Sequence, residues 1–188
     1  LLWLETISAP EEFKAAAEAF SHVELPWVGT MSFDTAGRTM MGTSPAEMVN
    51  LISSIPNKPI AFGANCGTGA SDLLRTIQDF VKSSPRSTLI AKGNAGIPKY
   101  ENGQILYDGT PELMAKYAVM ARNSGAKIIG GCCGTKPKHL RSMRAALENH
   151  VTEPVPSLEQ VKLEIGPFSS KIRKDIKDRK SKRRRHRV

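Results

Sequence analysis

The chain has 188 residues, 40% of them hydrophobic, and its 27 lysines and arginines outnumber its 18 aspartates and glutamates by nine charges. This apolar content excludes a wholly disordered chain, and no apolar run approaches the roughly 20 residues that a membrane-spanning helix needs. Three cysteines are too few for a disulfide scaffold and cannot all pair with one another, so we expect a reducing, cytoplasmic compartment.

Strands and helices are predicted to alternate along residues 1–149. Apolar runs predict the strands, and capping residues followed by apolar positions at helical spacing predict the helices. The predicted strands cover residues 1–5, 27–33, 59–66, 88–92 and 127–133. The predicted helices begin near residues 10, 45, 71, 111 and 137, the last of them ends at residue 148, and a long loop covers residues 94–109.

This alternation is typical of an α/β fold with a parallel sheet and right-handed crossovers. Two architectures fit it: a doubly wound open sheet, or about five βα units from the C-terminal part of a TIM-type (β/α)8 barrel, since a whole barrel needs about 250 residues. The chain opens in an apolar strand with no initiator methionine, so we expect earlier elements to be missing. In both architectures, functional residues lie at the carboxyl ends of the strands.

Two segments follow this body. Residues 150–170 contain three prolines and predict an irregular linker. Residues 171–188 contain 11 basic and 2 acidic side chains, so this basic tail carries the whole net charge. Such a composition cannot bury enough apolar surface to offset its ordering entropy, and we expect a disordered tail that is dispensable for chemistry. Nucleic-acid binding by the tail is the less favoured alternative.

All three cysteines lie at the carboxyl ends of predicted strands. Cys66 closes the run PIAFGANC, and Cys132 and Cys133 close AKIIGGCC. A lone free cysteine is usually a small packing residue, but the whole set lies at functional strand ends beside glycine, which favours a site. Neighbours on a regular strand point to opposite faces, so Cys132 and Cys133 can reach one centre only through a kink, which glycine permits.

Three thiols at one end of a sheet suit Zn²⁺. Thiolate is a strong zinc ligand, and three protein ligands leave the fourth tetrahedral position open for a substrate. A thiol that enters this position loses its proton near neutral pH and becomes a good nucleophile. The pattern therefore predicts an open zinc site for thiol alkylation, with no catalytic group beyond the metal-activated thiolate.

Two motifs around these cysteines, GANC at 63–66 and GGCCGT at 130–135, resemble those of the zinc-dependent homocysteine S-methyltransferases. That family includes betaine–homocysteine methyltransferase and the homocysteine module of cobalamin-dependent methionine synthase. The segments at 31–45 and 94–98 are also similar, so the resemblance covers roughly residues 1–149. It implies the barrel rather than the open sheet, with the chain starting at about the fourth strand, and a homocysteine-binding domain over 1–149 that is incomplete.

The resemblance also implies roles for individual residues. Cys66, Cys132 and Cys133 would be the zinc ligands, and Glu5, at the tip of the first strand, would bind the ammonium group of homocysteine. A carboxylate at a barrel-strand tip suits that role on its own chemistry, because it can pair with a cation. We expect structural roles for the other polar candidates: Asp34 and Arg38 order a loop, Asn94 lies in a turn, and His139 lies on the surface.

The methyl donor is predicted from mixed signals. Relatives from animals that use betaine place an aromatic residue directly after the carboxylate, whereas Thr6 follows Glu5 here, as in the methionine synthase module. No folate- or cobalamin-binding domain follows the barrel, however, which favours a stand-alone enzyme that uses betaine or a similar methyl donor. We expect this enzyme to be cytoplasmic, and a homo-oligomer is one expected form. The alternatives are a methyltetrahydrofolate/cobalamin-linked module and an inactive half-barrel with a nucleic-acid-binding tail.

Overall fold

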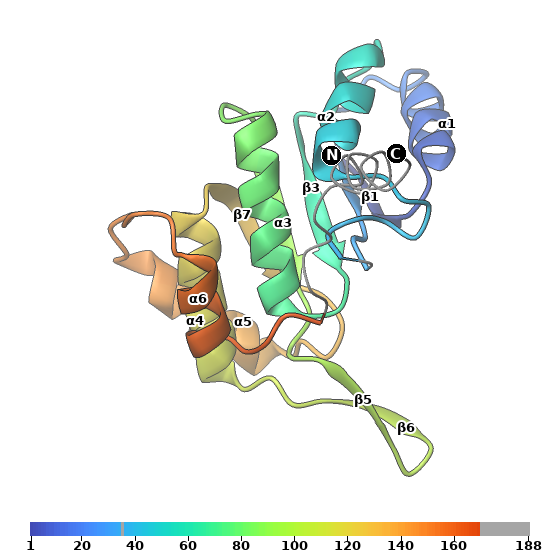
Figure 1. The fold of residues 1–188 in the computed structure, drawn as a ribbon. Coiled ribbons are helices and arrows are strands. Elements are labelled where there is room, and N and C mark those ends of the chain that lie inside the picture. The colour runs from blue at the N-terminus through green and yellow to red at the C-terminus, as the bar shows by residue number, and fades with distance from the viewer. Residues whose placement is uncertain (35, 170–188) are drawn as a thin grey trace, which may run out of the picture.

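A parallel five-stranded sheet forms the centre of the fold (Figure 1). The computed structural model describes residues 1–34 and 36–169, so the predicted basic tail lies outside the described residues. The strand order is β1-β2-β3-β4-β7, and every neighbouring pair is parallel. The strands are β1 (Leu2–Ile7), β2 (Trp27–Met31), β3 (Ala61–Cys66), β4 (Leu89–Gly93) and β7 (Ala126–Gly131). Their carboxyl ends therefore share one edge of the sheet.

After each strand of this sheet the chain forms a helix before the next strand of the sheet begins, as the sequence predicted. The helices are α1 (Pro10–Phe20), α2 (Pro45–Ser54), α3 (Ala70–Ser83), α4 (Pro111–Asn123) and α5 (Pro137–Glu148). Every one of these helices except α3 has a proline in its first turn. In that position the fixed φ of proline favours the helix, and its missing N–H costs nothing because the first N–H groups of a helix have no partner within the helix. The Ser44 hydroxyl caps α2 by accepting a hydrogen bond from the Glu47 N–H at 3.3 Å, and the Glu47 carboxylate accepts one from the Ser44 N–H at 2.7 Å.

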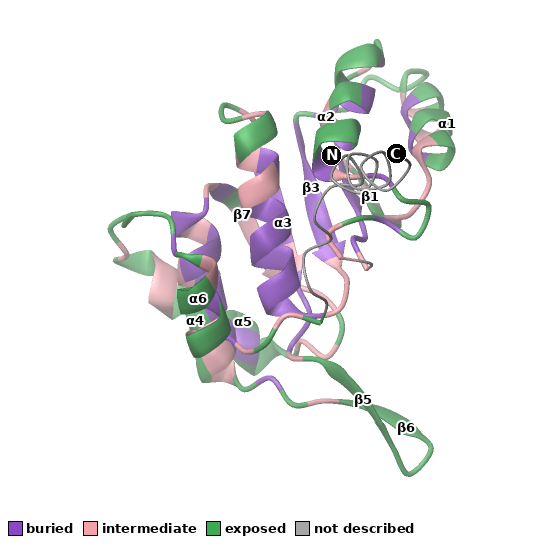
Figure 2. Ribbon diagram, viewed as in Figure 1, coloured by how far each residue is buried: buried purple, intermediate pink, exposed green. Residues whose placement is uncertain are grey.

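The apolar side chains form two clusters on opposite faces of the sheet. The larger cluster lies between the sheet and the helices, and its biggest fully buried members include Phe13, Trp27, Phe80 and Tyr117. The smaller cluster consists of Val28, Ala61 and Ile90, with Ile128 packed against it. Side chains alternate across a strand, so these residues lie on the face away from the helices. Figure 2 shows that α3 and β3 are largely buried.

The predicted long loop at residues 94–109 contains an antiparallel hairpin, formed by β5 (Pro98–Glu101) and β6 (Gln104–Tyr107). The hairpin projects from the body of the fold and is largely exposed (Figures 1 and 2). Its turn residues Asn102 and Gly103 have φ values of 50° and 80°. Asn-Gly with positive φ at both positions is the preferred two-residue hairpin turn, so the sequence contains a local signal for a hairpin where a loop was predicted.

The predicted irregular linker over residues 150–170 differs from the structure, because it contains the helix α6 (Leu158–Glu164). Ser157 caps this helix, and Val161 is fully buried in the main cluster. The prolines that favoured an irregular segment lie before the cap and after the helix end, where they do not interrupt the helical hydrogen bonds.

Within residues 1–34 and 36–169, no helix combines the length and apolar character needed to cross a membrane.

Candidate metal centre

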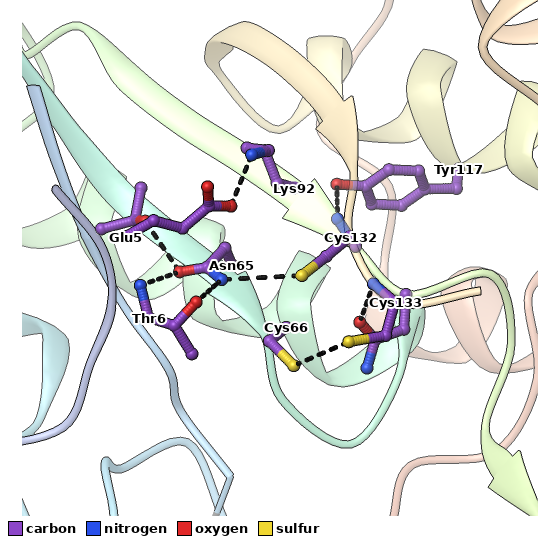
Figure 3. A network of polar contacts seen from close by, with 11 residues as sticks. Glu5, Thr6, Asn65, Cys66, Lys92, Tyr117, Cys132 and Cys133 are labelled. Carbon is purple, nitrogen blue, oxygen red and sulfur yellow. Dashed lines mark hydrogen bonds and ion pairs between the residues drawn. The ribbon is translucent and has the colours of Figure 1, made fainter. Parts of the chain in front are cut away.

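The three cysteine sulfurs converge at the carboxyl edge of the sheet (Figure 3). Cys66 ends β3, whereas Cys132 and Cys133 directly follow β7, and β4 lies between these two strands. All three Sγ atoms lie within 4.8 Å of one another, and the Cys66 and Cys133 sulfurs are 3.8 Å apart. The structure thus brings together the three residues that the sequence singled out.

The backbone leaves regular strand geometry at both cysteine segments. Cys66 has φ 59° and Gly67 has φ 72°, so β3 turns sharply at its last residue. The strand predicted over 127–133 ends at Gly131, and Gly134 has φ 74°. Cys132 and Cys133 therefore lie in a turn, and the alternation of side chains along a strand does not separate them. The predicted kink is therefore present. The glycines that adopt the left-handed conformation, Gly67 and Gly134, follow the cysteines rather than precede them.

Asn94 fixes the two cysteine segments relative to each other. Its side chain is buried, its Nδ2 donates a hydrogen bond to the Gly67 carbonyl at 2.9 Å, and its Oδ1 accepts one from the Cys133 N–H at 3.0 Å. Asn94 also lies in a turn, as predicted, because the Gly96 N–H bonds to its carbonyl oxygen. The sequence did not reveal that one amide side chain joins the loops that carry the sulfurs.

The buried Asn65 side chain is the centre of a polar network next to the sulfurs (Figure 3). Its Oδ1 accepts hydrogen bonds from the Thr30 hydroxyl at 2.7 Å and the Thr6 N–H at 3.0 Å. Its Nδ2 donates to the Thr6 hydroxyl at 2.7 Å and to the Cys132 sulfur at 3.7 Å. These four bonds use the full capacity of the amide group and connect β1, β2 and β3 to Cys132.

We expect Asn65→Ala to lower the free energy of unfolding by about 3 kcal/mol, because it leaves the buried Thr30 hydroxyl and the part-buried Thr6 N–H without their partner. Chemical denaturation of the full chain measures this loss. Thr30→Val is the matched control: it removes one hydrogen bond while preserving side-chain shape, and should cost about 1 kcal/mol. Equal losses in the two variants would show that the network has no role beyond the single Thr30 bond.

The pKa values of the neighbouring thiols indicate that a bound cation would stabilise their ionised form. The Cys66 thiol and the Asn65 amide donate hydrogen bonds toward the Cys132 sulfur and lower the pKa of Cys132 to about 5. The pKa of Cys66 is raised by that same hydrogen bond, by burial and by the neighbouring thiol of Cys133. One thiolate is therefore favoured at neutral pH, and further ionisation is opposed by charge repulsion that a divalent cation would relieve.

The donor set also fits a tetrahedral metal ion. A Zn–S bond of about 2.3 Å sets the distance between two sulfurs of a regular tetrahedron at about 3.8 Å. The observed separation of the Cys66 and Cys133 sulfurs is 3.8 Å, and the third sulfur lies within 4.8 Å of both. Soft thiolate ligands select metals such as zinc over magnesium or calcium. Cys66, Cys132 and Cys133 can therefore hold a zinc-like ion with small side-chain movements.

Glu5 lies near the carboxyl end of β1, and its carboxylate forms an ion pair with Lys92 of β4. The side chains of Glu5 and Lys92 are 33% and 21% exposed, so the pair is partly shielded from water. The Lys92 Nζ also lies 5.1 Å from the centroid of the Trp3 ring. Lys92 was missed in the sequence, although it is the one charged residue in the otherwise apolar strand β4.

The remaining predicted residues have local structural roles. Asp34 accepts a hydrogen bond from the Ser32 hydroxyl at 2.7 Å, and Arg38 bonds the Gly42 carbonyl at 2.7 Å and pairs with Glu47 at 3.0 Å, so both order their loop as expected. The prediction that His139 lies on the surface is wrong, because it is only 3% exposed. Its Nδ1 accepts a hydrogen bond from the Lys136 N–H at the start of α5, and burial lowers the pKa of His139.

Comparison with solved structures identifies the class of fold. Two structures of the homocysteine methyltransferase MmuM from Escherichia coli are similar. The apo form has a TM-score of 0.63 and 22% identity, with 78% of this chain and 49% of that chain covered. The metallated form has a TM-score of 0.62 and 23% identity, with 77% and 44% covered. The chain spans about half the length of these relatives, and the predicted part of a TIM-type barrel is confirmed.

The family follows from the sequence match. Residues 1–147 match the homocysteine S-methyltransferase family, so the chain belongs to that family. The matched range contains both cysteine segments and Glu5.

Proposed function

We propose that this chain forms the zinc- and homocysteine-binding part of a homocysteine S-methyltransferase that produces methionine. The observation that carries the proposal is the convergence of three sulfurs from two strand ends to within 4.8 Å. Membership of the family supplies the substrate class, a thiol and a methyl donor. The three free thiols also support the proposed cytoplasmic location, where they stay reduced.

Each residue has a distinct part in the proposed chemistry. Cys66, Cys132 and Cys133 would hold Zn²⁺, which when bound would lower the pKa of the homocysteine thiol and keep it nucleophilic. Asn65 and Asn94 hold the sulfur-bearing segments in place through their hydrogen bonds. Glu5 would bind the ammonium group and so aim the thiol of homocysteine at the three sulfurs.

For the methyl donor, we propose betaine or a similar small methylated onium compound. A second candidate, the methyltetrahydrofolate/cobalamin-linked reaction, is favoured by Thr6. The Thr6 hydroxyl accepts a hydrogen bond from Asn65, and its φ of 64° turns the chain immediately after Glu5. Thr6 therefore serves the polar network and presents no aromatic face to a quaternary ammonium group.

The test is a metal analysis and a methylation assay on the full-length protein. Homocysteine is supplied with betaine, with a sulfonium compound, or with methyltetrahydrofolate and cobalamin, and methionine is quantified. Methionine formation with a small donor alone supports the first proposal, and formation only with the folate and cobalamin supports the second. A zinc-loaded protein that produces no methionine with any donor overturns the proposed function.

A further inference from the structure

We propose that Glu5 and Lys92 act together as the recognition site for the amino-acid head group of the substrate, with Lys92 binding the α-carboxylate. This inference rests on the proposed function and adds Lys92 to it. The two side chains form an ion pair across the mouth of the site, one from β1 and the other from β4. A free α-amino acid carries the same two charges on a single carbon atom.

The register of the sheet places Lys92 on the functional face. Lys92 pairs with Asn65 on one side and with Gly130 on the other. Residues paired in parallel strands point to the same face, so the Lys92 side chain lies beside the Asn65 amide that bonds the Cys132 sulfur. Figure 3 shows Asn65 between the Glu5–Lys92 pair and the three sulfurs. The pair and the proposed metal ligands thus belong to one continuous site.

Neighbouring groups hold the Lys92 side chain in this position. A Cβ atom on Gly130 would meet the Lys92 Cγ at 3.4 Å, so the aliphatic stem runs across the glycine in van der Waals contact. The Nζ atom lies 5.1 Å from the centre of the Trp3 ring, where the ring face attracts a cation. The carboxylate of a ligand that entered the site from solvent would meet the Lys92 ammonium group, which these contacts already hold in position.

The stability that the ion pair contributes does not by itself explain why β4 contains a lysine. Residues Leu89, Ile90 and Ala91 of the same strand are all buried, and Lys92 is the strand's one break from apolar or glycine residues. A partly exposed ion pair contributes on the order of 0–1 kcal/mol to stability. The pair is better explained as a resting state in which each charge is neutralised until a ligand replaces both contacts.

A zwitterion can replace both contacts without leaving a charge unpaired. The ammonium group of homocysteine would take the place of Lys92 at Glu5, and the carboxylate would take the place of Glu5 at Lys92. A thiol that lacks either group would separate the pair and leave one partly shielded charge without a partner. The pair would therefore select α-amino-acid thiols over simple thiols, because sites built for polar groups reject analogues that lack them.

The experiment measures the affinity of the zinc-loaded, full-length protein for three thiols by calorimetry. The ligands are homocysteine, 4-sulfanylbutanoate, which lacks the ammonium group, and 3-sulfanylpropylamine, which lacks the carboxylate. Lys92→Met should weaken homocysteine binding about tenfold or more, and 3-sulfanylpropylamine should bind at least as tightly as to the wild type, because no ion pair has to separate. Glu5→Gln should weaken homocysteine binding to a similar degree, and 4-sulfanylbutanoate should bind at least as tightly as to the wild type for the same reason. Lys92→Arg, which keeps the charge, should restore most of the homocysteine affinity.

The controls separate this inference from the proposed function. Lys99 of β5 pairs at 2.6 Å with Asp108, which follows the hairpin, so Lys99→Met removes a paired lysine outside the site and should leave all three affinities unchanged. Retained zinc and retained binding of 3-sulfanylpropylamine show that Lys92→Met is folded. Unchanged homocysteine binding in Lys92→Met, or equal losses for all three thiols, overturns the inference alone. A zinc-loaded wild type that binds none of the thiols overturns the proposed function and this inference with it.

Discussion

Replacing Cys66 with alanine is expected to abolish zinc binding at stoichiometric metal and, with it, methyl transfer. Cys66 is the only ligand candidate from β3, whereas Cys132 and Cys133 are adjacent in one turn. Its loss leaves two thiols on one side of the site and removes the group that lies 3.8 Å from the Cys133 sulfur. Loss of a supporting group alone costs about 10–100-fold in metal affinity, and loss of a direct ligand should exceed this range.

Competition with a metal-binding dye measures the zinc affinity, and elemental analysis measures the zinc content of the purified protein. Cys66→Ser is the companion variant, because it keeps the shape of the side chain and replaces sulfur with a weaker ligand atom. Denaturation curves for both variants establish that they fold. Full zinc content in Cys66→Ala would remove Cys66 from the metal site and with it the main support for the proposed function.

Gly63→Ala is expected to destabilise the protein by about 3 kcal/mol or more, because it inserts a methyl group between two strands. A Cβ atom at this position would lie 2.0 Å from the Ile90 carbonyl oxygen and 2.7 Å from the Ile90 nitrogen. Gly63 pairs with Ile90 in the ladder between β3 and β4. Relief of the overlap requires the strands to separate, since backbone atoms cannot rotate away as a flexible side chain can.

Gly130→Ala is the matched control, since it adds the same methyl group to the same sheet. The nearest atom to a Cβ at Gly130 is the Lys92 Cγ, at 3.4 Å, which is an ordinary contact with a flexible side chain. We expect a loss of less than about 1 kcal/mol for this variant. Urea denaturation of both variants gives the comparison, and similar small losses would show that β3 and β4 can separate locally without cost.

Local signals predicted the elements whose residues lie close together in the sequence. Helix α5 has the predicted bounds, Pro137–Glu148, because its proline and its apolar spacing are both contained in one segment. The positions of the cysteines at strand ends were predicted for the same reason. The ends of the strands were predicted less accurately. The last strand was predicted to include Cys133, but it ends at Gly131, where a turn replaces the strand pairing.

The contacts that complete the site could not be predicted in this way. The Glu5–Lys92 pair joins residues 87 positions apart, and the Asn65–Cys132 bond joins residues 67 apart. These contacts depend on the strand order and register, which no short segment contains. Buried asparagines beside a cysteine or after a strand are the available signal, because a buried amide requires partners. Asn65 and Asn94 both meet that description.

The separation of the cysteines along the chain has a consequence for folding. Cys66 and Cys133 lie 67 residues apart, and the segment between them contains α3, β4, the hairpin and α4. An ion held by both would close this segment into a ring and reduce the number of conformations open to the unfolded chain. The stabilisation would fall on the ring and its neighbours, so a chelator should speed hydrogen exchange in α3 and α4 more than in α1.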